Sequence, residues 1–516
     1  MNGSPSQQAD VRYLDTRLSI NLDRLATTTN AGLFVALFAS AALGVLVSFY
    51  FHFLTVALLF LNLLNFYWMR VQKTHTLLAN YGLLAQIRYI VESVGPEFRQ
   101  YLFASDTEER PFSRNERAEV YRKAKGIDSS AAFGTQYDPS PGFITLRHSM
   151  FPTPVEERVP YQVTFGEENA SKAPYRITKP IMISAMSYGA LGPTAVRALA
   201  RGAKRAGIPM NTGEGGYPKY HLMEGCDLIF QMGTAKFGVR TPEGLLDEDK
   251  LAELAGHEAV RMIEVKFSQG AKPGKGGLLP KEKISREIAE LRGVSMGADV
   301  VSPPYHSECK DVPSTVAFIR RVQEISGLPV GFKMCVGRLS EFEALIREMK
   351  SQQVFPDFVT IDGAEGGTGA APKSFMDGVG VPIFEAMLSV RKILDDEGVT
   401  DRFKLLASGR LIDARRQLIA MSLGAAACYS ARGFMLALGC IQALQCNQNT
   451  CPVGITTHEP HLTRGLDVES KSIRVANYAD ALTHDHEELL AAMGKRHPKE
   501  LSPECVHVPR LVRFES

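Results

Sequence analysis

A long apolar run near the N-terminus is the strongest feature of the hydropathy pattern. Residues 25 to 69 contain no Asp, Glu, Lys or Arg. One spanning helix needs about 20 apolar residues, so the run predicts two transmembrane helices, at residues 33–50 and 53–68, with a tight reversal near His52. A secretory signal would be one shorter apolar region followed by a small-residue cleavage site. We therefore expect the run to persist in the mature chain.

Basic residues flank this run on both sides, with Arg12, Arg17 and Arg24 before it and Arg70 and Lys73 after it. Basic flanks favour the cytoplasmic side of a membrane, so both ends of the run are expected there. This predicts a hairpin in the cell (inner) membrane, with the remainder of the chain in the cytoplasm. The alternative is an apolar hairpin that packs on a partner protein.

The segment after the hairpin has helical apolar spacing from residue 74 to about 103, and Gly95-Pro96 predicts a helix end. Another helix is predicted to open after Ser113. We divide the chain into a polar N-terminal segment (1–24), a membrane segment (25–70), a linker and collar (71–178), a strand-and-helix domain (179–457) and a C-terminal helical extension (458–516).

Short apolar runs of β type alternate with helical stretches from Pro180 onward, which is typical of parallel strands joined by helices. Helices are predicted at residues 193–207 and 340–350. The strand candidates are PIMISAM, IPMNTG, DLIFQMG, MIEVKFS, DVVSPP, VGFKMC, FVTIDG, KLLASG and ACYSA. A (β/α)₈ barrel has eight positions, so one of these nine is an excursion, for which we choose DLIFQMG at residues 227–233.

Polar residues and glycines fall at the ends of the predicted strands. A barrel builds its active site from those loops, so their position favours an α/β TIM barrel with its site at the carboxyl ends of the strands. A doubly wound sheet would also alternate in this way, but the glycine-rich dinucleotide fingerprint after a first strand is missing. The strand-end residues are Ser187, Gly189, Glu214, Gly216, Gln269, Lys272, His306, Asp362, Gly366, Gly367, Ser408 and Gly409.

Charge and cysteine content narrow the function. The chain has 516 residues, with 58 basic and 56 acidic side chains, so its totals give no reason to expect a nucleic-acid partner. Eight cysteines are too sparse for a disulfide framework, and three of them lie in one short segment. That clustering indicates a metal site in a reducing compartment.

The three clustered cysteines are Cys440, Cys446 and Cys451, in the segment GCIQALQCNQNTCPVG. Thiolates at this spacing can converge on an iron–sulfur cluster, whereas the alternative is three buried, apolar cysteines. Zinc would require a fourth ligand, and the segment offers no histidine before His458. Three ligands favour a three-iron cluster.

Two glycine-rich segments, AEGGTGAAP at 364–372 and LLASGR at 405–410, follow late strands. Backbone amides in such loops can approach a phosphate, so the phosphate of flavin mononucleotide (FMN) would fit there, with Arg410 or Arg432 as counter-charge. Tight turns alone are the competing explanation for these glycines.

The segment 264–277, EVKFSQGAKPGKGG, places charged side chains at a strand end. Lys266 alternates in phase with Glu264 and Ser268, so these side chains would point into the barrel, where each needs a partner. One cation there could stabilise the reduced flavin, and another could hold a substrate carboxylate. Glu214, at the end of the second strand, could orient an ammonium or imine nitrogen. A solvated basic loop and an ordinary turn acid are the alternatives.

Together these motifs resemble the FMN-binding synthase domain of glutamate synthase over residues 180–457. The shared segments are SAMSYGAL, NTGEGG, QGAKPGKGG, SPPYH, EGGTGAAP and LGC-x5-C-x4-CPVG. The resemblance implies FMN, a 3Fe-4S cluster, and reductive amination of 2-oxoglutarate by ammonia to glutamate. It also implies that Lys272 and Arg292 bind the substrate carboxylates and that Lys266, Gln269, Lys333 and Gly367 line the flavin.

The full set of predicted site residues combines the strand-end positions with the resemblance. The catalytic candidates are Lys266, Glu214 and Lys272. The cofactor-binding candidates are Ser187, Gln269, Lys333, Gly366, Gly367, Ser408, Gly409 and Arg432.

The chain differs from the family pattern at two positions. Leu278 occupies the position of a family glutamine that contacts 2-oxoglutarate, and SPPYHS leaves only His306 where the family has two adjacent histidines. Two alternatives follow: a flavin oxidoreductase acting on a different amino or hydroxy acid, and a membrane-tethered electron-transfer subunit with little turnover.

We expect the chain to lack a glutaminase, a second flavin domain and a nicotinamide site, so ammonia and electrons come from elsewhere. The electron donor would be ferredoxin, a reductase subunit or quinone, and a separate glutaminase is a candidate partner. The catalytic domain is expected to be cytoplasmic.

Overall fold

The computed structural model describes residues 15–72, 74–127, 130–136, 143–169 and 171–509. The chain divides into two compact units, Met1–Ser113 and Arg114–Ser516, and each is described by itself. Most of the predicted polar segment 1–24, with its Arg12, and residues 510–516 of the predicted C-terminal extension lie outside the described residues or have no described side chains.

The N-terminal unit is a helical hairpin followed by shorter helices. Two stretches, Leu25–Leu46 and Phe51–Val71, are long and apolar enough to cross a membrane. The first helix ends four residues earlier than predicted, so the reversal comes before His52. The helices are α1 (Asp15–Leu46), α2 (Phe51–Phe66), the π-helical turn η2 (Tyr67–Val71), α3 (Thr76–Tyr81), α4 (Leu83–Phe98) and the π-helical turn η3 (Arg99–Phe103).

Polar side chains join α1 to α2 while large apolar side chains point outward. The hydroxyls of Ser40 and Thr55 are 3.1 Å apart, and Asn65 donates to the side chain of Asn30 at 2.9 Å. On the outer surface Phe38 is 70% exposed. Polar contacts inside and apolar residues outside are the arrangement that lipid-facing helices adopt, and an apolar surface of this kind marks a membrane or protein interface.

The predicted helix end at Gly95-Pro96 is wrong, because α4 continues through both residues. A proline inside a helix removes one backbone hydrogen bond, and here the next turn still forms. The chain breaks instead at Gly82, where φ is +53° and an added Cβ would lie 2.0 Å from the Asn65 side-chain oxygen. That oxygen accepts a hydrogen bond from the Leu83 amide at 2.8 Å.

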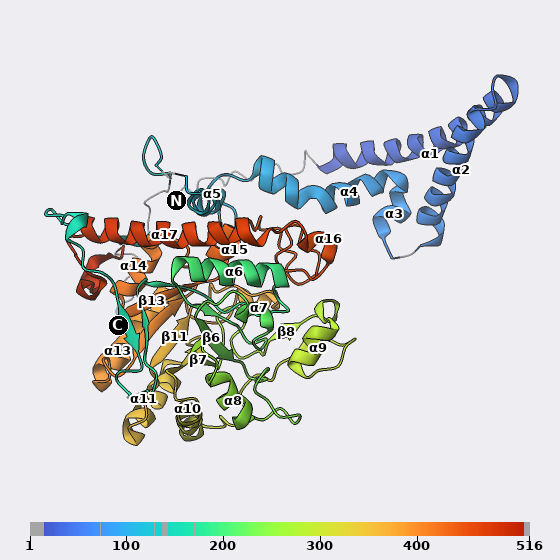
Figure 1. Cartoon of the computed structure of the whole chain (residues 1–516). Helices are drawn as coiled ribbons and strands as arrows, with labels where there is room; N and C mark the ends of the chain where they lie inside the picture. The colour runs from blue at the N-terminus through green and yellow to red at the C-terminus, as the bar shows by residue number, and fades with distance from the viewer. Residues whose placement is uncertain (1–14, 73, 128–129, 137–142, 170, 510–516) are drawn as a thin grey trace, which may run out of the picture. The chain divides into compact units, whose positions relative to one another are not determined.

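The larger unit is built on a closed barrel of eight parallel strands, which confirms the predicted fold class (Figure 1). Helices cover the outside of the barrel. The strands are β4 (Ile181–Ile183), β5 (Met210–Asn211), β6 (Leu228–Met232), β7 (Val260–Lys266), β10 (Val330–Met334), β11 (Phe358–Asp362), β12 (Lys404–Ser408) and β13 (Ala425–Ser430).

The helices of the larger unit include the three predicted from sequence. These three are α5 (Arg114–Ala124), α6 (Pro193–Ala206) and α11 (Leu339–Gln352). The others are α7 (Lys219–Leu222), α8 (Glu248–Ala255), α9 (Arg286–Arg292), α10 (Val312–Ser326), α12 (Lys373–Met376), α13 (Ile383–Glu397), α14 (Ala414–Ser422), α15 (Arg432–Leu438), α16 (Pro460–Thr463) and α17 (Val468–Ala492).

The choice of excursion strand was wrong. Residues 227–233 contain β6, which lies in the barrel between β5 and β7 and is buried at every position. The excursion is DVVSPP, whose strand β9 (Val300–Val301) pairs antiparallel with β8 (Leu278–Leu279) outside the barrel. Val301 is 63% exposed, and the two prolines that end DVVSPP suit a surface ribbon better than a central barrel strand.

The amino-terminal end of the barrel is closed by an apolar layer. A hairpin of β2 (Val163–Phe165) and β3 (Tyr175–Ile177) contributes to it. Gly331 lies opposite Phe358, and an added Cβ there would lie 2.4 Å from the Phe358 ring, so the glycine makes room for this ring inside the barrel. The layer contains Phe165, Ile177, Met182, Ile229, Met262, Phe358, Leu406, Ala427 and Tyr429.

A polar layer centred on Glu264 lies above the apolar one. Its carboxylate is fully buried and accepts hydrogen bonds from Asn211 at 2.9 Å, Gln231 at 2.7 Å and Thr360 at 2.7 Å. A buried polar group is tolerated when it is bonded in this way. The layer therefore ties four strands, β5, β6, β7 and β11, together beneath the barrel mouth.

The C-terminal helix α17 packs along α6 and α5 and completes the outer layer of this unit (Figure 1). An added Cβ at Gly202 of α6 would lie 2.4 Å from the Val475 side chain of α17, so glycine permits this close approach. After the C-terminal end of α17, the strand β14 (Val506–His507) pairs antiparallel with β1 (Thr145–Leu146). The short helical turns are η4 (Val155–Glu157), η5 (Lys281–Lys283), η6 (Pro498–Glu500) and η7 (Pro503–Cys505).

Replacing Glu264 with Leu should destabilise the barrel. Three buried donors would lose their acceptor, and each unsatisfied group costs about 1–3 kcal/mol, so we expect a loss of at least ~3 kcal/mol of unfolding free energy. Thermal unfolding followed by circular dichroism should show a clearly lower midpoint. Glu258→Leu, which removes an exposed carboxylate, is the matched control. Equal midpoints for the two variants would contradict the role given to Glu264.

Candidate active site at the barrel mouth

Charged side chains gather at the carboxyl ends of the barrel strands. Lys266 ends β7 and pairs with Glu214 at 2.7 Å, while Lys333 on β10 pairs with Asp362 of β11 at 3.3 Å. Lys266 and Lys333 are register partners on neighbouring strands. Like charges placed side by side repel each other, so the two carboxylates are needed to hold both lysines there.

Glu214 is the anionic centre of this group. Burial favours its neutral form, but Lys266, Lys272 and Arg292 together hold the pKa of the carboxyl below its ordinary value. On one side the backbone approaches it closely, since an added Cβ at Gly277 would lie 2.4 Å from the carboxylate. The carboxylate is therefore ionised and fixed in place.

Lys272 and Arg292 complete the charged cluster, and both are buried. Lys272 donates to the Ala370 carbonyl at 2.8 Å, and Arg292 donates to the Tyr188 carbonyl at 2.8 Å. Burial, with Lys266 and Lys275 nearby, lowers the pKa of Lys272 to about 8, whereas burial lowers that of Arg292 to about 10. Three cations around one carboxylate give the cluster an excess of positive charge, which suits an anionic ligand.

Glycines bring the strand ends close together beside this cluster. An added Cβ at Gly270 would lie 1.8 Å from the Gly363 carbonyl oxygen, and the Gly363 amide donates to Ser408 at 2.7 Å. Gly409 has a φ of +139°, and Gly366 donates to the Gly363 carbonyl at 2.9 Å. Backbone groups of β7, β11 and β12 therefore line one side of the mouth.

The remaining predicted residues lie in the same loops. The backbone carbonyl of Gln269 accepts from the Lys272 amide at 3.3 Å. Ser187 lies against the loop that carries Glu214, because an added Cβ at Gly213 would come 2.5 Å from its amide nitrogen. Gly367 adjoins Arg432, whose Nε would lie 2.8 Å from an added Cβ.

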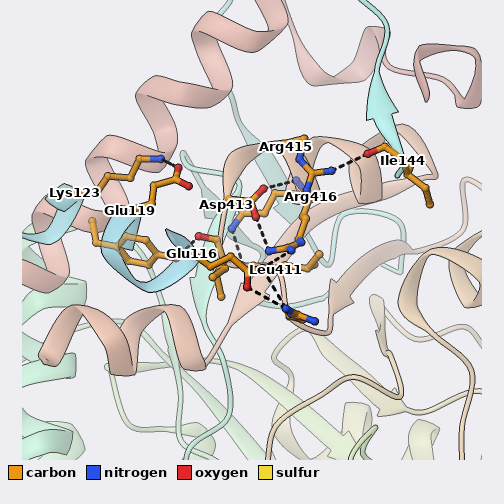
Figure 2. A network of polar contacts seen from close by, with 12 residues as sticks. Glu116, Glu119, Lys123, Ile144, Leu411, Asp413, Arg415 and Arg416 are labelled. Atoms are coloured by element: carbon orange, nitrogen blue, oxygen red, sulfur yellow. Dashed lines mark hydrogen bonds and ion pairs between the residues drawn. The ribbon is translucent and has the colours of Figure 1, made fainter. Parts of the chain in front are cut away.

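The two arginines considered as phosphate counter-charges differ in their surroundings. Arg432 donates to the carbonyl of Glu365 in the glycine-rich loop. Arg410 instead turns to Glu116 of α5, at 3.1 Å, and Arg416 of α14 bonds the same carboxylate. Figure 2 shows this polar network, in which the acidic side of α5 meets the start of α14. Arg432 is therefore the better placed of the two at the mouth.

A cavity of about 670 Å³ lies beside that network, between α5, α14 and α17. Its lining includes Glu116, Lys123, Asp413 and Arg416, which pair with acidic or basic neighbours. None of the residues predicted for the site lines it. Figure 2 shows Arg415 reaching the Ile144 carbonyl at 2.7 Å, so these side chains hold the collar to the barrel.

The three clustered cysteines follow α15 in one loop. They lie close enough together for negative charge on one sulfur to raise the pKa of another. Burial raises the pKa of Cys440 to about 11. Burial acts in the same direction on Cys451, but amide hydrogen bonds from Val453, Ile455 and Thr456 bring its pKa below the ordinary value. These amides create a position for a thiolate.

Positive φ values are concentrated in the loop between Cys440 and Cys451, where they are 60° at Gln442, 56° at Leu444 and 61° at Asn449. Such values are unusual for residues other than glycine. Among the described residues, no group of three or more His, Cys, Asp or Glu side chains is arranged around a single metal ion. In an iron–sulfur cluster each thiolate can bind a different iron atom, which requires wider spacing than one ion does.

Two residues support the site from outside the charged cluster: His306, which was predicted at a strand end, and Lys283, which was not identified from the sequence. His306 is buried, and its Nε2 lies 3.1 Å from the backbone carbonyl of Lys266, so it braces the end of β7. Lys283, in η5, is 2% exposed and donates to two loop carbonyls. Lys283 stands among charged residues in a loop without periodicity, so the sequence contained no signal for its burial.

The chain is similar to known proteins over most of its length. The conserved region in glutamate synthase matches residues 146–496. The "Glutamate synthase large subunit-like protein YerD" of Bacillus subtilis (strain 168) is 36% identical over 475 residues, covering 84% of this chain and 90% of that protein. The "Archaeal glutamate synthase (NADPH)" of Methanocaldococcus jannaschii is 36% identical over 319 residues, covering 62% of this chain and 60% of that protein.

Among solved structures, a mutant flavocytochrome b2 with benzoylformate has a TM-score of 0.45 and 13% identity, covering 78% of this chain and 81% of that one. The family assignment depends on the sequence matches, which extend over the whole barrel and its C-terminal helix. The chain is therefore a glutamate synthase-like oxidoreductase and belongs to the glutamate synthase family.

Proposed function

We propose that this protein is an FMN and iron–sulfur oxidoreductase that carries out reductive amination of 2-oxoglutarate, or a related 2-oxo acid, with ammonia. The observation that carries the proposal is the cluster at the barrel mouth in which the buried Lys266, Lys272 and Arg292 surround the half-buried Glu214. An amination site needs cations for the acid and an anion for the nitrogen, and this cluster has both.

The substrate side of the cluster is Lys272 and Arg292. Each has a bond to one backbone carbonyl, and the guanidinium Nε of Arg292 is buried with no hydrogen-bond partner among the described residues. A buried donor without a partner is costly, so a ligand carboxylate would satisfy it. We assign these two residues to the carboxylates of a 2-oxo acid.

Glu214 would orient the nitrogen. Its pKa below the ordinary value keeps it ionised, so it can accept hydrogen bonds from ammonium or from a protonated imine. Condensation of ammonia with the 2-oxo group releases water, and addition of a hydride and a proton to the resulting imine gives the amino acid. Lys266, held by Glu214 at 2.7 Å, is assigned with it to the catalytic set.

The residues at the mouth fit FMN. Backbone amides of the glycine-rich loops at Gly366, Gly367 and Gly409 together with Arg432 would hold its phosphate, and Lys266 and Lys333 would lie along a ring that becomes negative on reduction. Ser187, Gln269 and Ser408 complete the assigned binding set. Bound FMN would supply the hydride equivalent.

The cysteine loop fits an iron–sulfur cluster, and we assign Cys440, Cys446 and Cys451 as ligands of a 3Fe-4S cluster. The three thiols lie close enough to affect one another's pKa, and the amides around Cys451 favour its thiolate. The buried Lys283 beside them would also suit a negatively charged group there. Such a cluster would supply electrons one at a time.

The two apolar helices support a membrane anchor. Their outward apolar side chains would lie in the cell (inner) membrane and leave the barrel in the cytoplasm. Electrons would then come from quinone, ferredoxin or a separate reductase subunit, and ammonia would come free or from a separate glutaminase.

Leu278 favours a second candidate, in which the same cofactors act on a different amino or hydroxy acid. It lies in β8, the strand that follows the Lys272 loop, where an apolar side chain cannot donate a hydrogen bond to a substrate. An electron-transfer subunit with little turnover is the remaining alternative.

Rapid mixing of the anaerobically reduced protein tests the proposal. When 2-oxoglutarate and ammonium are added together, the flavin absorbance should return to that of oxidised flavin. Neither reagent alone should cause this change. Flavin that stays reduced with every 2-oxo acid and ammonium would refute reductive amination. Reoxidation by a quinone alone would favour the electron-transfer alternative.

Replacing Lys272 with Ala should weaken 2-oxo acid binding. Loss of a hydrogen bond to a charged group costs about 1.5–3 kcal/mol, or roughly a 10- to 100-fold rise in KM. Lys275→Ala, at an exposed position three residues away, should leave KM unchanged. An unchanged KM in Lys272→Ala would contradict the carboxylate assignment.

The pH dependence of binding should follow the Lys272 ammonium. The charged form predominates below its pKa of about 8, so kcat/KM for an anionic acid should be constant below that pH and fall as pH rises through it. The fall should be absent in Lys272→Ala. Wild-type and variant profiles of the same shape would exclude Lys272 as the titrating group.

Replacing Cys446 with Ser should remove the iron but leave the fold. We expect loss of iron by elemental analysis, with an unaltered circular dichroism spectrum, because the thiolate is a ligand and not part of the barrel core. Cys505→Ser changes a cysteine outside the loop and should retain iron. Equal iron in both variants would disprove the cluster assignment.

A further inference from the structure

The loop after β4 is held through three successive carbonyls. Arg292 donates to Tyr188 at 2.8 Å, the His458 ring lies 3.1 Å from the carbonyl of Gly189, and Lys283 donates to Ala190 at 2.6 Å. Two residues further on, the Gly192 amide donates to Ile455 in the cysteine loop at 2.9 Å. The loop is thus fixed between the charged cluster and the cysteines.

Lys283 also bonds the cysteine loop directly. Its ammonium donates to the Cys446 carbonyl at 3.1 Å while it donates to Ala190. The same side chain therefore joins the segment that carries a predicted cluster ligand to the loop that Arg292 holds. A set of hydrogen bonds therefore runs from Cys446 through Lys283 and the loop after β4 to Arg292, whose charge in turn acts on Glu214 at the barrel mouth.

Negative charge nearby would stabilise the buried ammonium of Lys283. It is 2% exposed, although its neighbours Lys281 and Glu282 on the same turn are exposed. No ion pair joins it to a carboxylate in the described part of the chain; Cys446, whose carbonyl it bonds at 3.1 Å, carries a thiol that becomes negative when it ligates a metal. A buried ammonium is costly unless it is paired, and carbonyl oxygens alone supply no net charge.

We propose that Lys283 is a positioning residue that fixes the Cys446 loop against the loop after β4 and, through its charge, raises the reduction potential of the bound cluster. The inference rests on the proposed iron–sulfur site. Reduction adds negative charge to a cluster, and a fixed cation close by stabilises the reduced form. The same side chain would thus hold the cluster close to the catalytic loops and set its potential.

The test compares Lys283→Met, Lys283→Gln and Lys283→Arg in the full-length protein, with Lys281→Met as the matched control on the same turn. The cluster potential is measured by redox titration followed by electron paramagnetic resonance. Loss of the charge should lower the equilibrium constant for reduction of the cluster about tenfold, which lowers its potential by ~59 mV for a one-electron couple. Lys283→Arg and Lys281→Met should keep the wild-type potential.

The outcomes separate this inference from the proposed function. Wild-type protein without iron would refute the cluster and the inference together. Wild-type protein with a cluster, and a potential unchanged in both Lys283→Met and Lys283→Gln, would overturn the inference alone. If Lys283→Met binds no iron, Lys283→Gln, which retains a hydrogen-bond donor, provides the charge test. Iron lost from both neutral variants but kept by Lys283→Arg, with the flavin spectrum unchanged, would support the inference.

Discussion

The pairing of buried charges at the ends of the barrel strands is the constraint on which this site depends. Lys266 and Lys333 occupy register partners on neighbouring strands, an arrangement that repulsion would disfavour. Glu214 and Asp362 compensate at 2.7 and 3.3 Å, and the Glu264 layer holds the strands below them. Charges with fixed partners are oriented before a substrate arrives, which is what electrostatic preorganisation requires.

Close backbone approaches let these charges share so small a space. An added Cβ would collide with a carbonyl at Gly270, with a carboxylate at Gly277, and with a carboxylate and the start of α13 at Gly363. Arg292 and Lys283 act at longer range, because each long side chain reaches a carbonyl in the loop after β4. These two side chains consequently connect the barrel mouth to the cysteine loop, and the residues next to them in the sequence do not predict this connection.

The sequence predicted the barrel, because strand and helix periodicity alternate clearly, and it placed Glu214, Lys266 and Lys272 at one end, because strand ends converge there. It failed in the choice of the excursion: DLIFQMG is in the barrel and DVVSPP is not, although the higher apolar content of the first and the two prolines of the second already favour that assignment. The motifs offered both Arg410 and Arg432, and the predicted set kept Arg432; the reason against Arg410 was not visible in the sequence, since its partner Glu116 lies almost 300 residues earlier. Lys283 was missed for the same reason, because its two acceptors are distant in sequence.

The closure of the barrel also orders events during synthesis. β13 must pair with β4, and α17 must pack on α6, so the first strand has no second neighbour until nearly the whole chain has left the ribosome. The α1–α2 hairpin, whose contacts are local, is complete long before that. Non-local pairing is slow and leaves strand edges exposed. The barrel therefore cannot close before β13 has been synthesised, and until then one edge of β4 has no partner strand.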